Sequence, residues 1–132
     1  MATKGRGQQQ SAKILVIDDE ALLRAMMCDA LEAAGHKVVV ASSGDEGLKL
    51  AKLERPDCIL LDIMMPGMDG YETCLALKAD PELAHIPVLM ASATSDLRVI
   101  DQAERVGALS VLPKPIPMGQ LQHAVALALI SA

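Results

Sequence analysis

The sequence has 132 residues, a length that suits one domain better than two. Hydrophobic residues make up 52% of the chain but aromatic residues only 1%, so a core must be built from aliphatic and methionine side chains. The formal net charge of −5 and the scarcity of aromatic rings argue against direct binding to nucleic acid or to an anionic membrane.

Residues 1–12 are polar, which predicts a disordered tail ahead of a single domain over residues 13–132. We find no apolar leader segment of the kind that directs secretion. The longest uninterrupted apolar run, residues 124–130, is far too short to cross a bilayer. We therefore expect a cytoplasmic protein that does not interact with a membrane.

Neither the cysteines nor the histidines have the spacing of a metal site. Each cysteine lies in an apolar stretch, which indicates a small buried side chain in a reducing compartment. The histidines are expected at the surface or at helix ends. The residues concerned are Cys28, Cys58, Cys74, His36, His85 and His123.

Short apolar runs alternate with helical patterns along the rest of the chain. In chain order we expect a strand at 14–17, a helix at 21–34, a strand at 37–41, a helix at 43–52, a strand at 58–61, a helix at 71–78, a strand at 88–91, a helix at 95–106, a strand at 110–112 and a helix at 118–130. Unbroken apolar strands that alternate with helices predict an α/β fold, with a parallel sheet covered on both faces.

Two helices show which of their faces should be buried. In the first helix, Leu22, Met26, Ala30 and Ala34 are spaced four apart and predict the buried side, with Gly35 as the C-cap. In the last helix, the face expected to pack on the sheet comprises Leu121, Val125, Ala128 and Leu129. Leu127 and Ile130 lie on the opposite side and are expected to be exposed, either as scattered apolar residues or as a patch that binds a partner or a second copy.

Two helix starts carry capping signals. Ser43 and Glu46 have the spacing of a capping box, and Asp69 precedes a predicted helix as an N-cap.

Chemically distinctive side chains follow the ends of four predicted strands. They are Asp18 and Asp19, Asp62, Ser92 and Lys114. Ligands of open parallel sheets bind outside the carboxyl ends of the strands, so we expect these side chains to share one site.

Each residue type in this group suits phosphoryl chemistry. Gathered carboxylates repel each other unless a cation joins them, and oxygen ligands suit Mg²⁺. A lysine and a hydroxyl provide the charge and the hydrogen-bond donor that a phosphoryl group requires. Asp62 could then act as a nucleophile and form an acyl phosphate.

The stretches around these residues resemble the receiver domain of bacterial response regulators. They are Asp18-Asp19, residues 62–70 (DIMMPGMDG), residues 87–93 (PVLMASA) and Lys114-Pro115, and the resemblance covers about residues 13–131. It implies a flavodoxin-like (βα)5 fold, a doubly wound five-stranded parallel sheet in the order 2-1-3-4-5.

The resemblance also implies a role for each residue of the metal site. Asp62 would be the phosphoacceptor and a metal ligand, and Asp19 a direct Mg²⁺ ligand. Asp18 would bind the ion through water, and the backbone carbonyl of Met64 would complete the ligands that the protein provides.

On the phosphoryl side, the resemblance implies that Ser92 hydrogen-bonds the phosphoryl group and that Lys114 pairs with it. The Lys114-Pro115 bond would be cis. Met64 and Thr94, two residues beyond Asp62 and Ser92, would line the path of attacking water and set the phosphoryl lifetime.

The sequence departs from the family pattern on the output side. Val111 stands where many receivers carry an aromatic residue that swings inward on phosphorylation, and Ile116 replaces a common Phe. The departure puts the usual output mechanism in doubt, but not the phosphorylation chemistry, because Val111 lies outside the metal site.

The resemblance implies a cognate histidine kinase or phosphotransfer protein as the donor, and a downstream protein partner bound by the surface of residues 95–130. A homodimer is also open. No effector domain follows in this sequence, so output is expected through binding, through phosphorelay or through a domain outside it.

Two alternatives remain beside a phosphorylation switch, which is not an enzyme beyond its own phosphoryl transfer and dephosphorylation. A degenerate receiver would bind partners without phosphorylation, as the missing aromatic at Val111 allows. A Mg²⁺-dependent phosphohydrolase of the haloacid-dehalogenase type would need an acid/base Asp where this chain has Met64, which cannot move a proton.

Overall fold

The computed structural model describes residues 11–94 and 96–131. Five parallel strands form one sheet in the order β2-β1-β3-β4-β5, as predicted. The strands are β1 (Lys13–Ile17), β2 (Lys37–Ala41), β3 (Cys58–Asp62), β4 (Val88–Ser92) and β5 (Ser110–Pro113). The helices are α1 (Ala21–Ala33), α2 (Gly44–Glu54), α3 (Gly70–Ala79), α4 (Leu97–Arg105) and α5 (Met118–Ser131).

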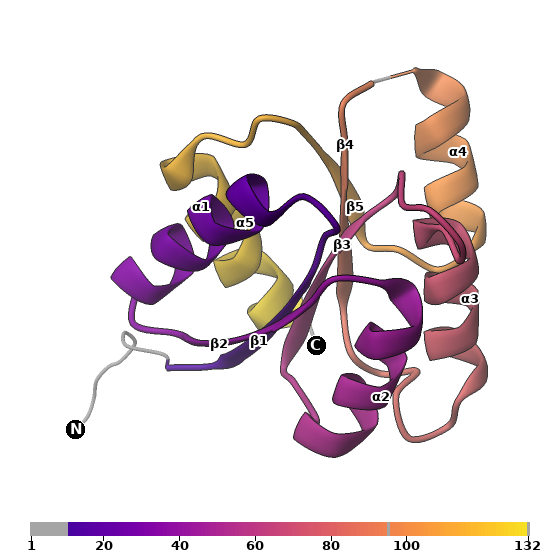
Figure 1. Cartoon of the computed structure of the whole chain (residues 1–132), viewed down its shortest axis with the longest axis horizontal. Helices are drawn as coiled ribbons and strands as arrows, with labels where there is room; N and C mark the ends of the chain where they lie inside the picture. Colours follow the sequence, from indigo (N-terminus) through magenta and orange to yellow (C-terminus); the bar gives the residue numbers. More distant parts are fainter. Residues whose placement is uncertain (1–10, 95, 132) are drawn as a thin grey trace.

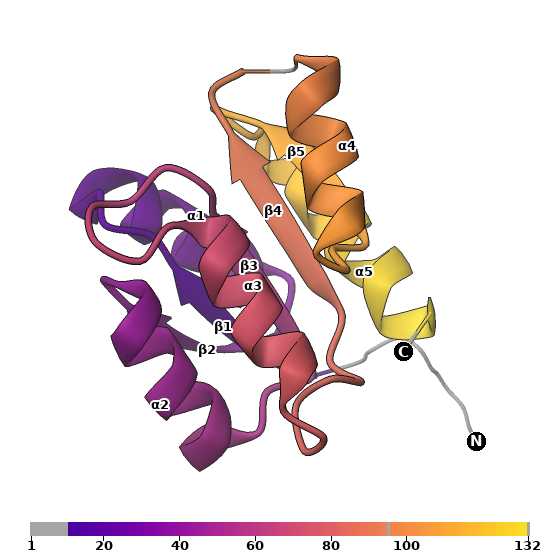
Figure 2. The same cartoon turned by 90° about the vertical axis from the view of Figure 1, so that its right-hand side faces the viewer.

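The helices form a layer on each face of the sheet (Figures 1 and 2). Helices α1 and α5 lie side by side on one face, and α2, α3 and α4 cover the other. Successive residues of β1 point to opposite faces, so Ile14 packs in one apolar cluster and Leu15 in the other. This arrangement explains why the strands are apolar throughout instead of alternating with polar residues.

The central strands are the most deeply buried. Every residue of β3 and β4 is buried, whereas the edge strands β2 and β5 keep exposed positions. The register aligns the carboxyl ends: Ile17 pairs with Ala41 and with Leu61, and Asp62 pairs with Ala91. Residues that follow β1, β3 and β4 therefore emerge at one edge of the sheet.

The predicted buried face of α1 is right at Ala30 only. Leu22 is 74% exposed and Met26 is 52% exposed, whereas Met27, Ala30 and Leu31 face the sheet. The helix carries apolar side chains on most of its circumference, so the spacing of four does not identify the side that packs.

The end of α1 is closer to the prediction. The helix ends at Ala33, with Ala34 as its C-cap. Gly35 follows with a φ of +94°, a conformation that glycine adopts without strain.

Of the two predicted capping signals, the one at Asp69 is confirmed and the one at Ser43 is confirmed in part. Asp69 caps α3, and its side chain and that of Glu72 form a reciprocal capping box. Ser43 caps α2 by accepting a hydrogen bond from the N–H of Glu46, but the Glu46 carboxylate accepts from Ser42 instead.

The other helix ends differ from the prediction by a few residues. Helix α4 begins at Leu97, where the Asp96 side chain accepts a hydrogen bond from the N–H of Arg98. Ser95, the predicted start of this helix, lies outside the described residues. Helix α2 ends at Glu54, beyond the predicted end, and Arg55 follows it in the left-handed region.

The faces of α5 agree with the prediction. Leu121, Val125 and Ala128 are buried and Leu129 packs against them, while Leu127 and Ile130 are 52% and 80% exposed. Two of the three cysteines, Cys58 and Cys74, are buried, but Cys28 is only partly buried. All three thiols are free.

Most of the predicted N-terminal tail, residues 1–10, lies outside the described residues. Within the described residues, no helix is both long and apolar enough to cross a bilayer.

Candidate functional site

Four backbone segments meet at the carboxyl edge of the sheet. Asp18 directly follows β1, and its N–H donates to the carbonyl of Ala41 at 3.1 Å. Asp62 and Ser92 are the last residues of β3 and β4. The N–H of Lys114 donates to the carbonyl of Ser92 at 2.8 Å, which places the segment after β5 beside the end of β4.

Three carboxylates converge at this edge. Asp18, Asp19 and Asp62 each place an oxygen within 4.8 Å of the others. Asp18 is fully buried and Asp62 is 4% exposed, whereas Asp19 is exposed. Such a gathering of like charges requires positive charge nearby.

The hydrogen bonds of Asp18 leave one of its oxygens available. Oδ1 accepts a hydrogen bond from the N–H of Glu20 at 2.8 Å. Oδ2 is buried and accepts no hydrogen bond from the described residues. A buried oxygen in this state, within an all-oxygen group of three carboxylates, fits a hard divalent cation such as Mg²⁺.

Lys114 supplies the positive charge that the structure contains. Its Nζ donates to Oδ1 of Asp62 at 3.0 Å and lies 3.3 Å from Oδ2 of Asp18. A third carboxylate, Glu20, lies 3.6 Å away. Burial lowers the pKa of Lys114, but Asp62 and Asp18 outweigh this effect and raise it, so the ammonium stays charged.

The environment of Asp62 disfavours its charged form. Burial raises the pKa of Asp62 to about 6, and the carboxylates of Asp18 and Asp19 add to the rise. The hydrogen bond from Lys114 opposes it. A cation that neutralised these charges would favour the carboxylate form that a nucleophile requires.

The loop after β3 is held tightly against Asp62. A Cβ at Gly70 would lie 2.5 Å from the carbonyl oxygen of Asp62 and 2.6 Å from Cα of Ile63. The N–H of Gly70 donates to the carbonyl of Ile63 at 2.8 Å. Only glycine permits this approach, which fixes the loop that carries Met64.

The other residues predicted for the site are Ser92 and Met64. Ser92 is buried, and its Oγ accepts a hydrogen bond from the N–H of Thr94 at 3.2 Å. Met64 lies two residues beyond Asp62, with its side chain 73% exposed. The Lys114-Pro115 bond is cis, in agreement with the prediction.

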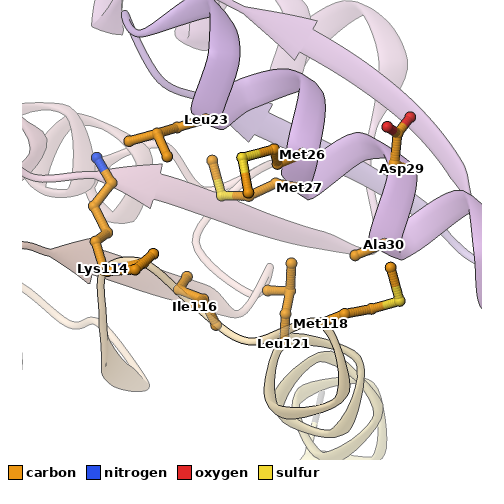
Figure 3. A pocket seen from close by; sticks show the side chains of 10 residues that line it. Leu23, Met26, Met27, Asp29, Ala30, Lys114, Ile116, Met118 and Leu121 are labelled. Carbon is orange, nitrogen blue, oxygen red and sulfur yellow. The ribbon is translucent and has the colours of Figure 1, made fainter.

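Two further features belong to this edge. Glu20, the residue before α1, lies within ion-pair distance of Lys114. An apolar hollow of about 200 Å³, which no sequence pattern indicated, lies between α1 and the segment after β5 (Figure 3). Leu23 and Met26 line the hollow from one side and Ile116 from the other.

The two positions where the sequence departs from the family pattern, Val111 and Ile116, lie in apolar surroundings. Val111 is half-buried in β5 and lines a pocket of about 310 Å³ against α4, together with Ile100 and Leu109. Ile116 is partly buried and packs against the apolar cluster under α1 and α5.

The chain is similar to known signalling proteins over most of its length. The family described as "Response regulator receiver domain" matches residues 14–126. Response regulator PleD of Caulobacter vibrioides is 44% identical over 107 residues, which are 80% of this chain and 23% of that protein. Protein PilH of Pseudomonas aeruginosa is 35% identical over 105 residues, 80% of this chain and 87% of that protein.

Solved structures agree with the sequence relatives. The chemotaxis protein CheY4 of Vibrio cholerae is 30% identical with a TM-score of 0.86, over 90% of this chain and 99% of that chain. A putative response regulator of Chloroflexus aurantiacus is 30% identical with a TM-score of 0.88, over 92% of this chain and 99% of that chain.

Several relatives are longer proteins. The chain spans 46% of the probable transcriptional regulator ycf27 of Porphyridium aerugineum, to which it is 36% identical over 113 residues, 86% of this chain. The similarity therefore concerns one domain of these longer proteins and not their overall activity. The match over residues 14–126 and the shared fold show that this chain belongs to the response regulator receiver domain family of two-component signalling.

Proposed function

We propose that this domain accepts a phosphoryl group on Asp62 in a Mg²⁺-dependent reaction, and that the added charge switches the binding of a protein partner. The observation that carries the proposal is the group formed by buried Asp62, two further aspartates and Lys114. Receiver domains bind Mg²⁺ at an acidic pocket, and this chain has the acidic cluster.

Asp18, Asp19 and Asp62, with the backbone carbonyl of Met64, would hold the ion. When bound, Mg²⁺ supplies positive charge that neutralises the carboxylates and the incoming phosphoryl oxygens. The proposed arrangement is supported by the oxygen-only donor set and by Oδ2 of Asp18, which accepts no hydrogen bond from the described residues and has only the Lys114 ammonium nearby, at 3.3 Å.

The chemical step transfers the phosphoryl group from a phosphohistidine of the donor to Asp62. A carboxylate oxygen of Asp62 attacks phosphorus, the bond from phosphorus to the donor's histidine nitrogen breaks, and the imidazole leaves with the bonding electrons. Lys114 then pairs with a phosphoryl oxygen, and Ser92 donates a hydrogen bond to another. These roles fit the ammonium that already lies 3.0 Å from Asp62.

The donor in this proposal is a cognate histidine kinase or phosphotransfer protein. A protein that brings a phosphohistidine to Asp62 must cover this edge of the sheet. The apolar hollow of Figure 3 opens beside Lys114 and offers such a donor a place for one of its apolar side chains.

The output surface in this proposal is residues 95–130. Leu97, Ile100 and Leu109 are exposed apolar side chains in this range, on α4 and on the segment before β5. A downstream partner, or a second copy in a homodimer, would bind there. Because Val111 replaces the usual aromatic residue, the structural change would pass through backbone and loop shifts and not through a ring.

The proposal places a single domain, residues 13–132 behind a tail, in the cytoplasm. The buried free thiols of Cys58 and Cys74 suit a reducing compartment. Fractionation of cells that produce the whole protein would test the location.

One alternative function has a specific observation in its favour. The absence of an aromatic side chain at Val111 suits a binding module that works without phosphorylation. Beryllofluoride, a mimic of the phosphoryl group, separates the two. With Mg²⁺ present, we expect it to shift amide signals of residues near Asp62, Ser92 and Lys114 in the NMR spectrum. The same titration of Asp62→Asn should leave the spectrum unchanged, and an unchanged wild-type spectrum would support the alternative.

A further inference from the structure

Glu20 is an exposed carboxylate beside the proposed phosphoacceptor site. Its Oε1 lies 3.6 Å from Nζ of Lys114, and its side chain is 61% exposed. Its N–H donates to Oδ1 of Asp18, which fixes its backbone next to the aspartate cluster. Although Glu20 is the N-cap residue of α1, its side chain makes no capping hydrogen bond. The carboxylate is therefore not held in place by a capping hydrogen bond.

The charges around Lys114 do not balance. The site holds four carboxylates, those of Asp18, Asp19, Glu20 and Asp62, and one ammonium, which leaves a formal charge of −3. A divalent cation would bring this charge to −1. The cation and Lys114, which lies nearer to Asp62 and Asp18 than to Glu20, would together neutralise the three aspartates, so the remaining negative charge would belong to Glu20.

A second cation nearby does not remove this excess. Arg24 donates through its guanidinium to the main-chain oxygen of Asp18 at 2.7 Å. Among the described residues, Arg24 forms no ion pair with the four carboxylates, so it does not neutralise any of them directly.

We infer that Glu20 is a specificity-determining residue, which disfavours free dianionic phosphoryl donors of the acyl phosphate class. A dianion that approaches Asp62 meets the charge of Glu20 at close range, where two unit charges interact strongly even near water. A monoanionic donor experiences about half of this repulsion. A protein donor offsets it through contacts that a small molecule lacks. The inference rests on the proposed phosphorylation of Asp62.

The test compares two small donors of different charge at neutral pH: acetyl phosphate, a dianion, and phosphoramidate, chiefly a monoanion. Glu20→Gln keeps the shape of the side chain and removes its charge. At saturating Mg²⁺ and low ionic strength, we expect it to increase the rate of phosphorylation by acetyl phosphate about three- to tenfold, and by phosphoramidate less. Both increases should shrink toward unity as salt is added. Glu32→Gln, the same change at an exposed site near the other end of α1, should leave both rates unchanged.

A second measurement does not depend on phosphorylation. Calorimetric titration with Mg²⁺ alone should show weaker binding to Glu20→Gln than to the wild type, by a few-fold at low salt, because a negative charge has been removed from the neighbourhood of the ion. Glu20→Asp, which retains the charge, should stay close to the wild type in both measurements.

The outcomes separate this inference from the proposed function. If the wild type is phosphorylated but Glu20→Gln is no faster with acetyl phosphate, the inference alone is overturned. Equal acceleration with both donors, unaffected by salt, also overturns it, because the effect would then be structural. A wild type that takes no adduct from either donor contradicts the proposed function itself and removes the inference with it.

Discussion

Burial works against the ionisation of Asp62. Its pKa is raised to about 6 from an ordinary value of 3.8, because the carboxyl group is buried and lies near Asp18 and Asp19. Between about pH 4 and pH 6, the folded protein therefore binds a proton at Asp62 that the unfolded chain has released. In this range folding becomes less favourable as the pH rises. Above about pH 6 the full destabilising effect of the ionised group is present.

This imbalance predicts a pH-dependent effect of Asp62→Asn in metal-free protein. At about pH 7.5, we expect the substitution to increase the free energy of unfolding by about 1–2 kcal/mol, because it removes a buried charge. The gain should shrink as the pH falls and disappear by about pH 3, where the wild-type carboxyl group is largely neutral in both states. Urea unfolding with a chelator measures both values, with Asp29→Asn on the exposed side of α1 as the control. A gap that does not change with pH would contradict the account.

Met64 predicts a long-lived phosphoryl group. Its thioether side chain is exposed two residues beyond Asp62 and cannot orient an attacking water molecule as an amide can. We expect phosphorylated Met64→Asn to lose its phosphoryl group several-fold faster than the wild type. Decay followed by intact mass after removal of the donor tests this expectation, and equal decay rates would rule it out.

The positions of the strands could be predicted from the sequence, but the buried side of α1 could not. The strands were predicted within a residue or two, because unbroken runs such as Ile14 to Ile17 fit only strands buried on both faces. The buried side of α1 was not, because Met26 and Met27 are equally apolar and only the position of the sheet distinguishes them. Helix α4 begins at Leu97, two residues after the predicted start, because the Asp96 side chain caps it.

One side chain connects α3 to the segment before β4 by hydrogen bonds that no sequence pattern indicated. Lys78, near the end of α3, is half-buried, and its Nζ donates to the carbonyls of Ala84 at 3.0 Å and Ile86 at 2.8 Å. Burial lowers the pKa of Lys78. In the sequence it is one more lysine on a helix, but in the fold it anchors the segment that leads into β4.

Removal of the two Lys78 hydrogen bonds should lower the stability of the fold without changing the phosphoacceptor site. We expect Lys78→Met, which keeps the apolar stem, to lower the free energy of unfolding by about 1–3 kcal/mol, because two carbonyls lose their donor. Lys49→Met at an exposed position of α2 is the matched control and should change stability little. Chemical denaturation of the three proteins measures the difference. Equal stability of Lys78→Met and Lys49→Met would show that the two hydrogen bonds contribute nothing.

At the scale of the whole molecule, parallel topology determines where the site lies. Because the strands run in one direction, Asp18, Asp62 and Ser92 arrive at the same edge although they are far apart in the sequence. This rule made the location of the site predictable from the sequence alone. The contact of Glu20 with Lys114 was not predictable, since their distance depends on how α1 leaves the sheet and how the segment after β5 returns to it.

The same topology separates the site from the proposed output surface. Asp62 lies in the centre of the sheet, and β5 lies at its edge next to α4. A signal from Asp62 can reach β5 through β4 or through Lys114, which follows β5 and donates to Asp62 at 3.0 Å, but Val111 in β5 offers no aromatic ring to move. Any such signal begins with the phosphorylation of Asp62.

The mass of the intact protein after incubation with phosphoramidate and Mg²⁺ tests this point most directly. We expect a single phosphoryl adduct on the wild type, and no adduct on Asp62→Asn or on the wild type incubated with a chelator. An adduct that persists in Asp62→Asn, or that forms equally well with the chelator, would contradict Mg²⁺-dependent phosphorylation of Asp62.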